Sequence, residues 1–343
     1  MGLDYRPVLW NTHKKTYDKW IAIGMLIYLS GFVGITIALN PESTAETLII
    51  RAFGTLSIAL LHIILAIGPL ARLHPNFLPL LYNRRHLGVS MFLAAFVHGA
   101  FSIIQFHTLG NVNAFYALFT SNMDYGSLIN FPFQVLGFFA LIILFLMAAT
   151  SHDFWLKNLS PKIWKRLHMM VYFAYALVLL HVFLGALQQQ PSFWSIGILS
   201  LGFIGIASLH LATGIKETKV DKQKAKIIEE GWEYVCSLEE IPEDRAKIFI
   251  VDKERVALFK YDGKLSAISN VCKHQGGPLG EGKVVDGCVT CPWHGYQYLP
   301  HNGQSPPPFT EKIATYRLKT IADKIYVDPK GLPEGTAVEP ATF

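Results

Sequence analysis

Charged residues are scarce in this chain of 343 residues, because Asp, Glu, Lys and Arg together make up only 16% of it. A typical soluble domain carries about one quarter. The deficit lies almost entirely before residue 215, where apolar residues dominate, and it excludes a wholly soluble protein. The asymmetry predicts two parts, a membrane half followed by a soluble half.

The net charge is also modest, at a formal +5, and it makes no case for nucleic-acid binding. The basic residues of the first half stand at the ends of apolar runs rather than in one basic stripe. We therefore expect the lipid bilayer as a partner of this chain and no nucleic acid.

Cysteine is rare, with only Cys236, Cys272, Cys288 and Cys291 in the whole sequence. Two of these belong to the motifs described below, and nothing argues for a disulfide between the other two. Free thiols are consistent with a reducing compartment. A nicotinamide-binding fingerprint is missing as well, because no Gly-x-Gly-x-x-Gly sequence opens a helix.

The first half contains six apolar segments, each near the ~20 residues that a spanning helix requires. They run approximately over Trp20–Leu39, Leu48–Leu70, His86–His107, Phe131–Thr150, Trp164–Leu187 and Phe193–Thr213. The sequence therefore predicts several domains. These are a cytoplasmic segment at 1–19, an all-α six-helix transmembrane bundle at 20–213, a charged linker at 214–230, a soluble domain at 231–329 and a tail at 330–343.

Lys and Arg gather at alternate ends of these segments. They precede the first segment, follow the sixth, and lie between the second and third and between the fourth and fifth, whereas the other loops carry almost none. Cytoplasmic loops are enriched in Lys and Arg. We therefore expect a multi-pass protein of the inner cell membrane with both termini in the cytoplasm.

Two short motifs in the soluble half place Cys and His at metal-ligand spacing. They are Cys272-Lys-His274 and, after a gap of sixteen residues, Cys291-Pro-Trp-His294. A structural zinc site is the common interpretation of two Cys and two His. Glycines and prolines follow both motifs, however, as in Gly276-Gly277-Pro278. They favour two tight loops held against each other over a finger with its helix.

With these motifs, the soluble half resembles the Rieske iron–sulfur fold over about a hundred residues. The resemblance implies an all-β domain with a [2Fe-2S] cluster, in which two Cys bind one iron and two His bind the other. By the same resemblance, Cys272 and Cys291 are the sulfur ligands, and His274 and His294 are the nitrogen ligands.

Quinol-oxidising respiratory members of that fold carry a loop disulfide, and its two positions are Gly277 and Trp293 here. Those members also place a Ser and a Tyr shortly after the second His ligand. This chain has Tyr296 and Tyr298 there, so only the second residue is kept. Hydrogen bonds to cluster sulfur tune the potential. We therefore expect a potential below the top of the Rieske range.

Histidines inside spanning segments are costly and usually functional. His168 and His181 lie thirteen residues apart on the fifth segment, a rise of about 20 Å that would stack two haems across a bilayer. His86 and His98 lie at matching depths on the third segment, which predicts the axial pairs His86–His168 and His98–His181. A rotation of about 120° between His86 and His98 weakens the first pair. For His62, a haem ligand, a propionate partner and part of a quinone pocket all stay open.

The residues Arg84-Arg85-His86-Leu87-Gly88 with His98, and Trp164-Lys165-Arg166-Leu167-His168 with His181, carry a second resemblance. Over about Ile49–Leu187 the chain resembles the ferric-reductase-like haem b family. Within that family it is most similar to the membrane haem subunit that serves periplasmic methionine sulfoxide reductase. The resemblance implies b-type haem, with His98, His168 and His181 as the matching histidines. The expectation of two haems comes from the depth argument alone. The role of His86 as a ligand has the same basis, because that subunit has a nonpolar residue at this position.

These features predict a membrane electron-transfer oxidoreductase. Electrons would pass from a soluble donor through the cluster and the b haems to an acceptor at the outer face or in the membrane. The donor would be a cytoplasmic flavoprotein reductase or ferredoxin, and the acceptor a periplasmic redox partner, ferric iron or a quinone. One alternative is a quinol-oxidising protein that supplies a cytoplasmic oxygenase through the Rieske domain. The other is a redox-sensing or assembly protein without steady turnover.

Overall fold

The computed structural model describes residues 12–81, 83–108, 110–151, 155, 159–188, 193–222, 226–228 and 231–343. Parts of the predicted N-terminal segment (1–11) and of the predicted linker (223–225 and 229–230) lie outside this range. The described chain divides into two compact units. One comprises residues 12–68 and 83–210, and the other contains residues 69–81 and the described part of 211–343.

The first unit is helical. Its long elements are α1 (Thr12–Leu39), α2 (Ala45–Leu73), α4 (Arg84–His107), α6 (Phe133–Ala149), α8 (Pro161–Met169), α9 (Val171–Gln188) and α10 (Phe193–Lys222). The short helix α5 (Ala114–Thr120) also belongs to this unit, whereas the short helices η1 (Pro75–Phe77) and α3 (Leu78–Leu81) belong to the other. Helix ends follow local capping chemistry, since Asn113 accepts the Phe115 N–H at 2.9 Å at the start of α5.

Five helices in the described part of the chain are long and apolar enough to cross a membrane. They correspond to five of the six predicted segments. The sixth segment, predicted at Phe131–Thr150, forms the shorter helix α6, which has 17 residues. Apolar side chains such as Leu26 and Ile27 of α1 lie exposed, which suits a lipid environment. A multi-pass membrane protein is therefore supported, whereas a count of six spans is not confirmed.

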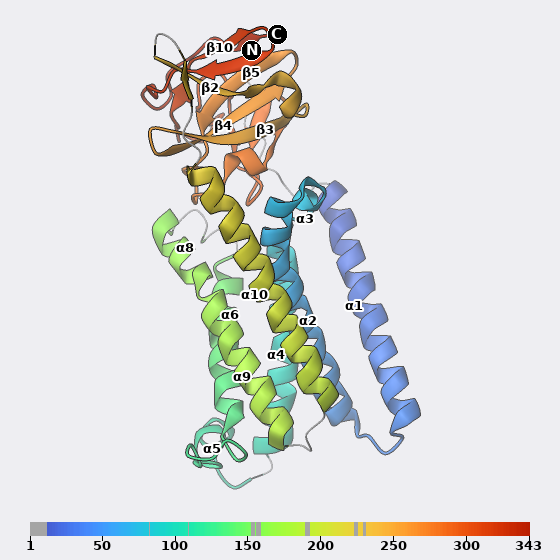
Figure 1. The fold of residues 1–343 in the computed structure, drawn as a ribbon. Helices are drawn as coiled ribbons and strands as arrows, with labels where there is room; N and C mark the ends of the chain where they lie inside the picture. Colours follow the sequence, from blue (N-terminus) through green and yellow to red (C-terminus); the bar gives the residue numbers. More distant parts are fainter. Residues whose placement is uncertain are drawn as a thin grey trace. The chain divides into compact units, whose positions relative to one another are not determined.

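Helix α6 contacts both α9 and α4, and these three helices, labelled in Figure 1, are here called the packed centre of this unit. Helix α6 packs along α9 on one side and against α4 on the other. Ala140 of α6 and Ala174 of α9 are almost fully buried. Small side chains of this kind let helix backbones approach closely in a membrane. The packed centre is also where the histidines of α4 and α9 meet.

The second unit is rich in β-strands and forms three antiparallel sheets (Figure 1). The first orders β1 (Lys226–Ile228), β2 (Trp232–Ser237), β11 (Lys324–Val327) and β10 (Leu318–Ile321). The second orders β12 (Ala341–Thr342), β5 (Lys264–Ser269), β4 (Glu254–Tyr261) and β3 (Arg245–Val251), with β9 (Thr315–Tyr316) beside β5. The third orders β6 (Lys283–Val285), β7 (Cys288–Thr290) and β8 (Gln297–Tyr298).

Strand β4 lies at the centre of the second sheet and of the core. Its residues from Val256 to Phe259 are fully buried on both faces of the strand. The turn to β5 places Asp262 and Gly263 at φ values of 45° and 69°, as a two-residue hairpin turn requires. The β-rich domain predicted from the sequence is thus present, and its third sheet frames the two Cys-His motifs.

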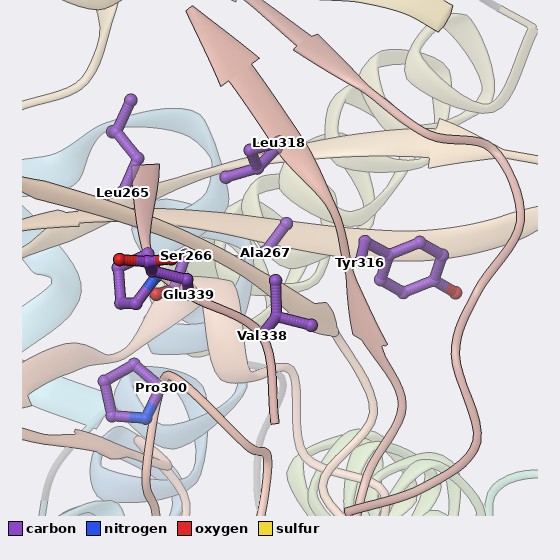
Figure 2. Close-up of a pocket in the computed structure, with 9 residues that line it drawn as sticks. Leu265, Ser266, Ala267, Pro300, Tyr316, Leu318, Val338 and Glu339 are labelled. Atoms are coloured by element: carbon purple, nitrogen blue, oxygen red, sulfur yellow. The ribbon is translucent and has the colours of Figure 1, made fainter. Parts of the chain in front are cut away.

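The C-terminal segment, residues 328–343, packs onto this β domain. Strand β12 pairs with β5, and Val338 N–H donates to the His301 carbonyl at 2.8 Å. Figure 2 shows Val338 and Glu339 beside Ser266 and Ala267 of β5, around a small cleft. With a volume of about 10 Å³, the cleft has room for one water at most. The segment predicted as a tail at 330–343 therefore completes a sheet edge.

Candidate metal centre and haem histidines

The two Cys-His motifs form loops with the same backbone hydrogen bonds. In the first, Gly276 N–H donates to the Cys272 carbonyl at 2.7 Å, and Cys272 N–H donates to the carbonyl of Gly277 at 2.9 Å. In the second, Gly295 N–H donates to the Cys291 carbonyl at 2.9 Å, and Cys291 N–H donates to the carbonyl of Tyr296 at 2.8 Å. Both loops therefore turn back at the same distance from their cysteine.

A glycine with positive φ makes each turn possible. Gly276 has φ of 73° and Gly295 has φ of 74°, and this left-handed region is strained for any residue with a Cβ. Each glycine follows its cysteine by four residues. The matching loops place their cysteines and histidines on facing sides of one site.

The four predicted ligands come together as two like pairs. The thiols of Cys272 and Cys291 lie within hydrogen-bonding reach of each other, and both are buried. The rings of His274 and His294 have centroids 5.2 Å apart and cross at 86°. In the described part of the chain, no three His, Cys, Asp or Glu side chains gather as a group that could hold one metal ion. Paired cysteines and paired histidines fit a two-iron cluster better than a single zinc ion.

The loops touch where respiratory Rieske proteins carry their disulfide. A Cβ on Gly277 would lie 2.7 Å from Cys291 Sγ and 3.2 Å from the Trp293 ring. The indole therefore fills the space beside the first loop, and all four cysteines of the chain are free thiols. The pairing of these two positions was inferred from the resemblance, and the contact agrees with it.

The two tyrosines after His294 point in different directions. The Tyr298 hydroxyl lies 3.5 Å from Cys272 Sγ and accepts the Lys273 N–H at 2.9 Å. The Tyr296 ring instead stacks on His274, with centroids 4.8 Å apart and planes 8° apart, and its hydroxyl donates to the Glu311 carboxylate. Only Tyr298 therefore offers a hydroxyl to a cysteine sulfur.

The two thiols differ in acidity. Burial raises the pKa of Cys291 well above its ordinary value, and the neighbouring Cys272 adds to the effect. Burial also acts to raise the pKa of Cys272, but hydrogen bonds from Cys291 and Tyr298 help to reverse it and lower that pKa. Two adjacent buried thiolates can form together only beside strong positive charge, which iron would supply. This donor set fits the predicted [2Fe-2S] cluster.

In the helical unit, His98 of α4 faces His181 of α9. Their ring centroids lie 6.0 Å apart, and the ring planes cross at 80°. His98 Nδ1–H donates to the Ile50 carbonyl at 2.8 Å, and His181 Nδ1–H donates to the Phe133 carbonyl at 2.9 Å. Metal-bound histidines usually donate their second nitrogen in this way, which leaves Nε2 for the metal. The pair fits two axial ligands of one haem iron.

The predicted partners His86 and His168 have other contacts. His86 Nδ1 lies 2.8 Å from an Asp18 carboxylate oxygen, and Asp18 also accepts from Asn83 at 2.6 Å. His168 stacks on Trp164 with centroids 3.7 Å apart, and its Nδ1–H donates to the Trp164 carbonyl. The structure records no ring contact between the two histidines within the described residues. The depth argument therefore has geometric support for one pair only.

His62 of α2 has contacts at both ring nitrogens. Nδ1–H donates to the Ile58 carbonyl at 2.8 Å, and Nε2 accepts the Tyr175 hydroxyl at 3.0 Å. Both ring nitrogens of His62 are thus occupied, which disfavours a haem ligand among the three roles that the sequence left open. The contact with Tyr175 is one that the sequence did not predict. Sequence reasoning missed Asp18 and Tyr175. The only sequence features that could have indicated these contacts are the position of Asp18 just before an apolar segment and the position of Tyr175 within one.

Two family models match the sequence. Residues 231–317 match the Rieske [2Fe-2S] domain, and residues 53–179 match the ferric reductase like transmembrane component. The anthranilate 1,2-dioxygenase ferredoxin subunit of Burkholderia cepacia is 28% identical over 98 residues, which cover 28% of this chain and 91% of that protein. The biphenyl dioxygenase ferredoxin subunit of Pseudomonas sp. strain KKS102 is 32% identical over 96 residues, covering 27% and 87%.

Among solved structures, the ferredoxin of carbazole 1,9a-dioxygenase from Nocardioides aromaticivorans IC177 is similar. It has 23% sequence identity and a TM-score of 0.28 over 29% of this chain and 100% of its own. All three proteins are ferredoxins of dioxygenase systems by name, and each corresponds to less than a third of this chain.

Proposed function

We propose that this chain passes single electrons across a membrane. The premise is its family membership: residues 231–317 belong to the Rieske [2Fe-2S] domain family, and residues 53–179 belong to the ferric reductase like transmembrane component family. The two families together indicate a membrane electron-transfer oxidoreductase. A [2Fe-2S] cluster and b-type haem supply one-electron chemistry when bound, and the protein supplies position and tuning.

One observation carries the proposal. His98 and His181 face each other in the packed centre of a helical unit, each with its Nδ1–H donated to a backbone carbonyl. Intramembrane histidines arranged like this are expensive and fit a cofactor-binding role. The same chain carries paired cysteines and paired histidines in its β domain.

The residues have separate roles in this proposal. Cys272 and Cys291 would hold one iron of the cluster, and His274 and His294 the other. His98 and His181 would hold a b haem deep in the bundle. His168 and His86 would serve a second haem near the cytoplasmic side, with His168 the better supported because the family resemblance includes it. His62 would not ligate iron while it accepts from Tyr175.

Direction and orientation are further parts of the proposal. The Lys and Arg distribution supports a cytoplasmic Rieske domain in the inner cell membrane. A cytoplasmic flavoprotein reductase or ferredoxin would then reduce the cluster, and electrons would leave at the outer face or to a quinone, a periplasmic partner or ferric iron.

A redox titration of the whole protein, followed by optical and EPR spectra, tests this function. We expect a Rieske EPR signal in the reduced state and a low-spin b-haem spectrum. His294→Ala should abolish the first signal only. His98→Ala or His181→Ala should remove the haem of that pair only, which lowers the haem content by one per chain and leaves the Rieske signal in place. His301→Ala and His107→Gln are the matched controls and should leave both signals in place. A β domain that contains zinc and no iron would overturn the cluster assignment.

A second candidate function is a quinol-oxidising protein that supplies electrons to a cytoplasmic oxygenase through the Rieske domain. The similarity to ferredoxin subunits of dioxygenases favours it. Stopped-flow reduction separates the two. Rapid haem reduction by a quinol analogue, without a cytoplasmic reductase, would favour the second candidate, and rapid reduction through the cluster would favour the first. If neither donor reduces the haem at a useful rate, a sensing role becomes the better explanation.

A further inference from the structure

The helical unit contains two copies of one local arrangement around its facing histidines. In the first copy, His98 of α4 reaches across to α2, where its Nδ1–H donates to the Ile50 carbonyl at 2.8 Å. One turn further along α2, Gly54 lies against the imidazole. A Cβ on Gly54 would be 2.7 Å from Nδ1 and 3.0 Å from Cε1 of His98, closer than real Cβ atoms come to other atoms.

The second copy has the same parts. His181 of α9 reaches across to α6, where its Nδ1–H donates to the Phe133 carbonyl at 2.9 Å. A Cβ on Gly137 would be 2.7 Å from Nδ1 and 2.8 Å from Cε1 of His181. In both copies the histidine follows its acceptor carbonyl by 48 residues, and the glycine follows that carbonyl by four.

Each arrangement, here called a glycine seat, fixes two properties of an imidazole. A carbonyl can only accept a hydrogen bond, so Nδ1 must carry the proton and Nε2 has the lone pair that binds iron. The bare backbone at the glycine also determines how far the ring can approach and turn. Together the two seats hold the rings 6.0 Å apart with their planes crossed at 80°.

We propose that Gly54 and Gly137 are positioning residues that hold the His98 and His181 imidazoles crosswise, with Nε2 of each presented to one haem iron. The inference rests on the proposed haem-binding function and adds two residues that do not touch the metal. Proximity to histidine alone does not make such a seat. Gly202 lies against His62 as well, but there Nδ1 bonds to its own helix and Nε2 accepts from Tyr175.

The crossed ring planes supply a spectroscopic test. Axial imidazoles held crosswise give low-spin ferric haem a highly anisotropic EPR signal, whereas parallel rings give a rhombic one. We therefore expect the highly anisotropic signal from the wild-type protein. In Gly54→Ala and Gly137→Ala, the signal should become rhombic or fall at least threefold in amplitude per chain, with a shifted haem midpoint potential.

Gly88→Ala on α4 is the matched control, because a Cβ there meets nothing within 4 Å. Alanine is the better helix former, so none of the three substitutions weakens a helix by propensity. Far-UV circular dichroism and the elution volume of the purified protein report whether the helical unit of each variant has folded, and the Rieske signal reports the same for the β domain. Wild-type spectra and midpoint potentials in both Gly54→Ala and Gly137→Ala would overturn the inference.

Free imidazole tests the seat even if Gly54→Ala loses haem. His98→Gly opens the seat, and added imidazole should restore the low-spin spectrum. In His98→Gly/Gly54→Ala, we expect the imidazole concentration for half-restoration to rise at least fivefold, and an unchanged concentration would contradict the seat.

His98→Ala alone separates this question from the proposed function. If that variant keeps the wild-type number of low-spin haems per chain, the haem site is wrong, whereas the loss of one haem beside a normal Gly54→Ala rejects only the seat.

Discussion

The Tyr298 side chain combines core packing with a polar contact at the candidate cluster site. It is fully buried, and its hydroxyl lies 3.5 Å from Cys272 Sγ while it accepts the Lys273 N–H. The ring fills the core whether or not the hydroxyl is present. The hydroxyl proton, however, stabilises negative charge on sulfur, which is greater in the reduced cluster.

Tyr298→Phe should therefore lower the Rieske midpoint potential without unfolding the domain. A hydrogen bond to a charged group contributes roughly 1.5–3 kcal/mol, and only the difference between redox states appears in the potential. We expect a decrease on the order of 50 mV, since 59 mV is a tenfold change for one electron. Voltammetry on the full chain measures it. Tyr296→Phe is the control, because that hydroxyl points to Glu311. An unchanged midpoint in Tyr298→Phe would show that the hydroxyl does not act on the cluster.

Sequence spacing predicted the contact of Tyr298 with a cysteine sulfur, whereas it made no prediction for the contacts of Tyr296. Position four after His294 is fixed by one tight loop and the short strand β8, so its direction follows from local geometry. The direction of Tyr296 depends on Glu311, which lies fifteen residues away. Contacts between residues so far apart in the sequence are determined by tertiary packing, which a local sequence pattern does not predict.

Among the structural elements, the paired cluster loops have the clearest requirement. Each returns through a glycine with positive φ, a conformation that costs most residues with a Cβ about 1–2 kcal/mol. The glycines therefore determine where the cysteines and histidines point.

Gly276→Ala should lower the cluster content of the protein by more than its effect on stability explains. The substitution costs about 1–2 kcal/mol of backbone strain, and a Cβ there meets nothing within 4 Å. Gly263→Ala imposes the same strain on the β4–β5 turn, at φ of 69° and also in open space. We expect iron and acid-labile sulfide to be reduced in Gly276→Ala and retained in Gly263→Ala, although the two variants carry the same backbone strain. Equal cluster content would mean that the loop tolerates the change.

The helices were predictable to different degrees. Apolar length alone located α1, α2, α4, α9 and α10, because a spanning helix needs a long apolar run. The fourth segment became a 17-residue helix, since its boundaries depend on Pro132 at one end and Thr150 at the other. Depth along helices brought His98 and His181 together correctly. The depth of a residue could not predict that His86 bonds to Asp18 on α1, because the sequence of neither segment indicates that α1 packs against α4.

At the scale of the whole molecule, composition separated the membrane half from the β domain, and the family matches agree with that division. The charge pattern adds an orientation that the fold by itself does not contain. Lys and Arg stand at one set of loop ends, whereas residues 110–130 contain neither. Residues 110–130 therefore contain no trypsin site, whereas aromatic residues that chymotrypsin recognises occur both there and in residues 231–343.

Trypsin should therefore cut the protein from one side of the membrane only. It cleaves after Lys and Arg, which are frequent in residues 231–343, whereas chymotrypsin cleaves after aromatic residues such as Phe115, Tyr116 and Tyr125, which lie in the loop that we expect on the outer face. In sealed right-side-out vesicles, we expect chymotrypsin to cut within 110–130 and trypsin to leave the β domain intact. Inverted vesicles should give the reverse result, and detergent should expose both regions.

Tryptic loss of residues 231–343 from sealed right-side-out vesicles would place the Rieske domain outside. The positive charges at the loop ends would then not determine the orientation of this chain, and the cytoplasmic donor of the proposed function would have no access to the cluster.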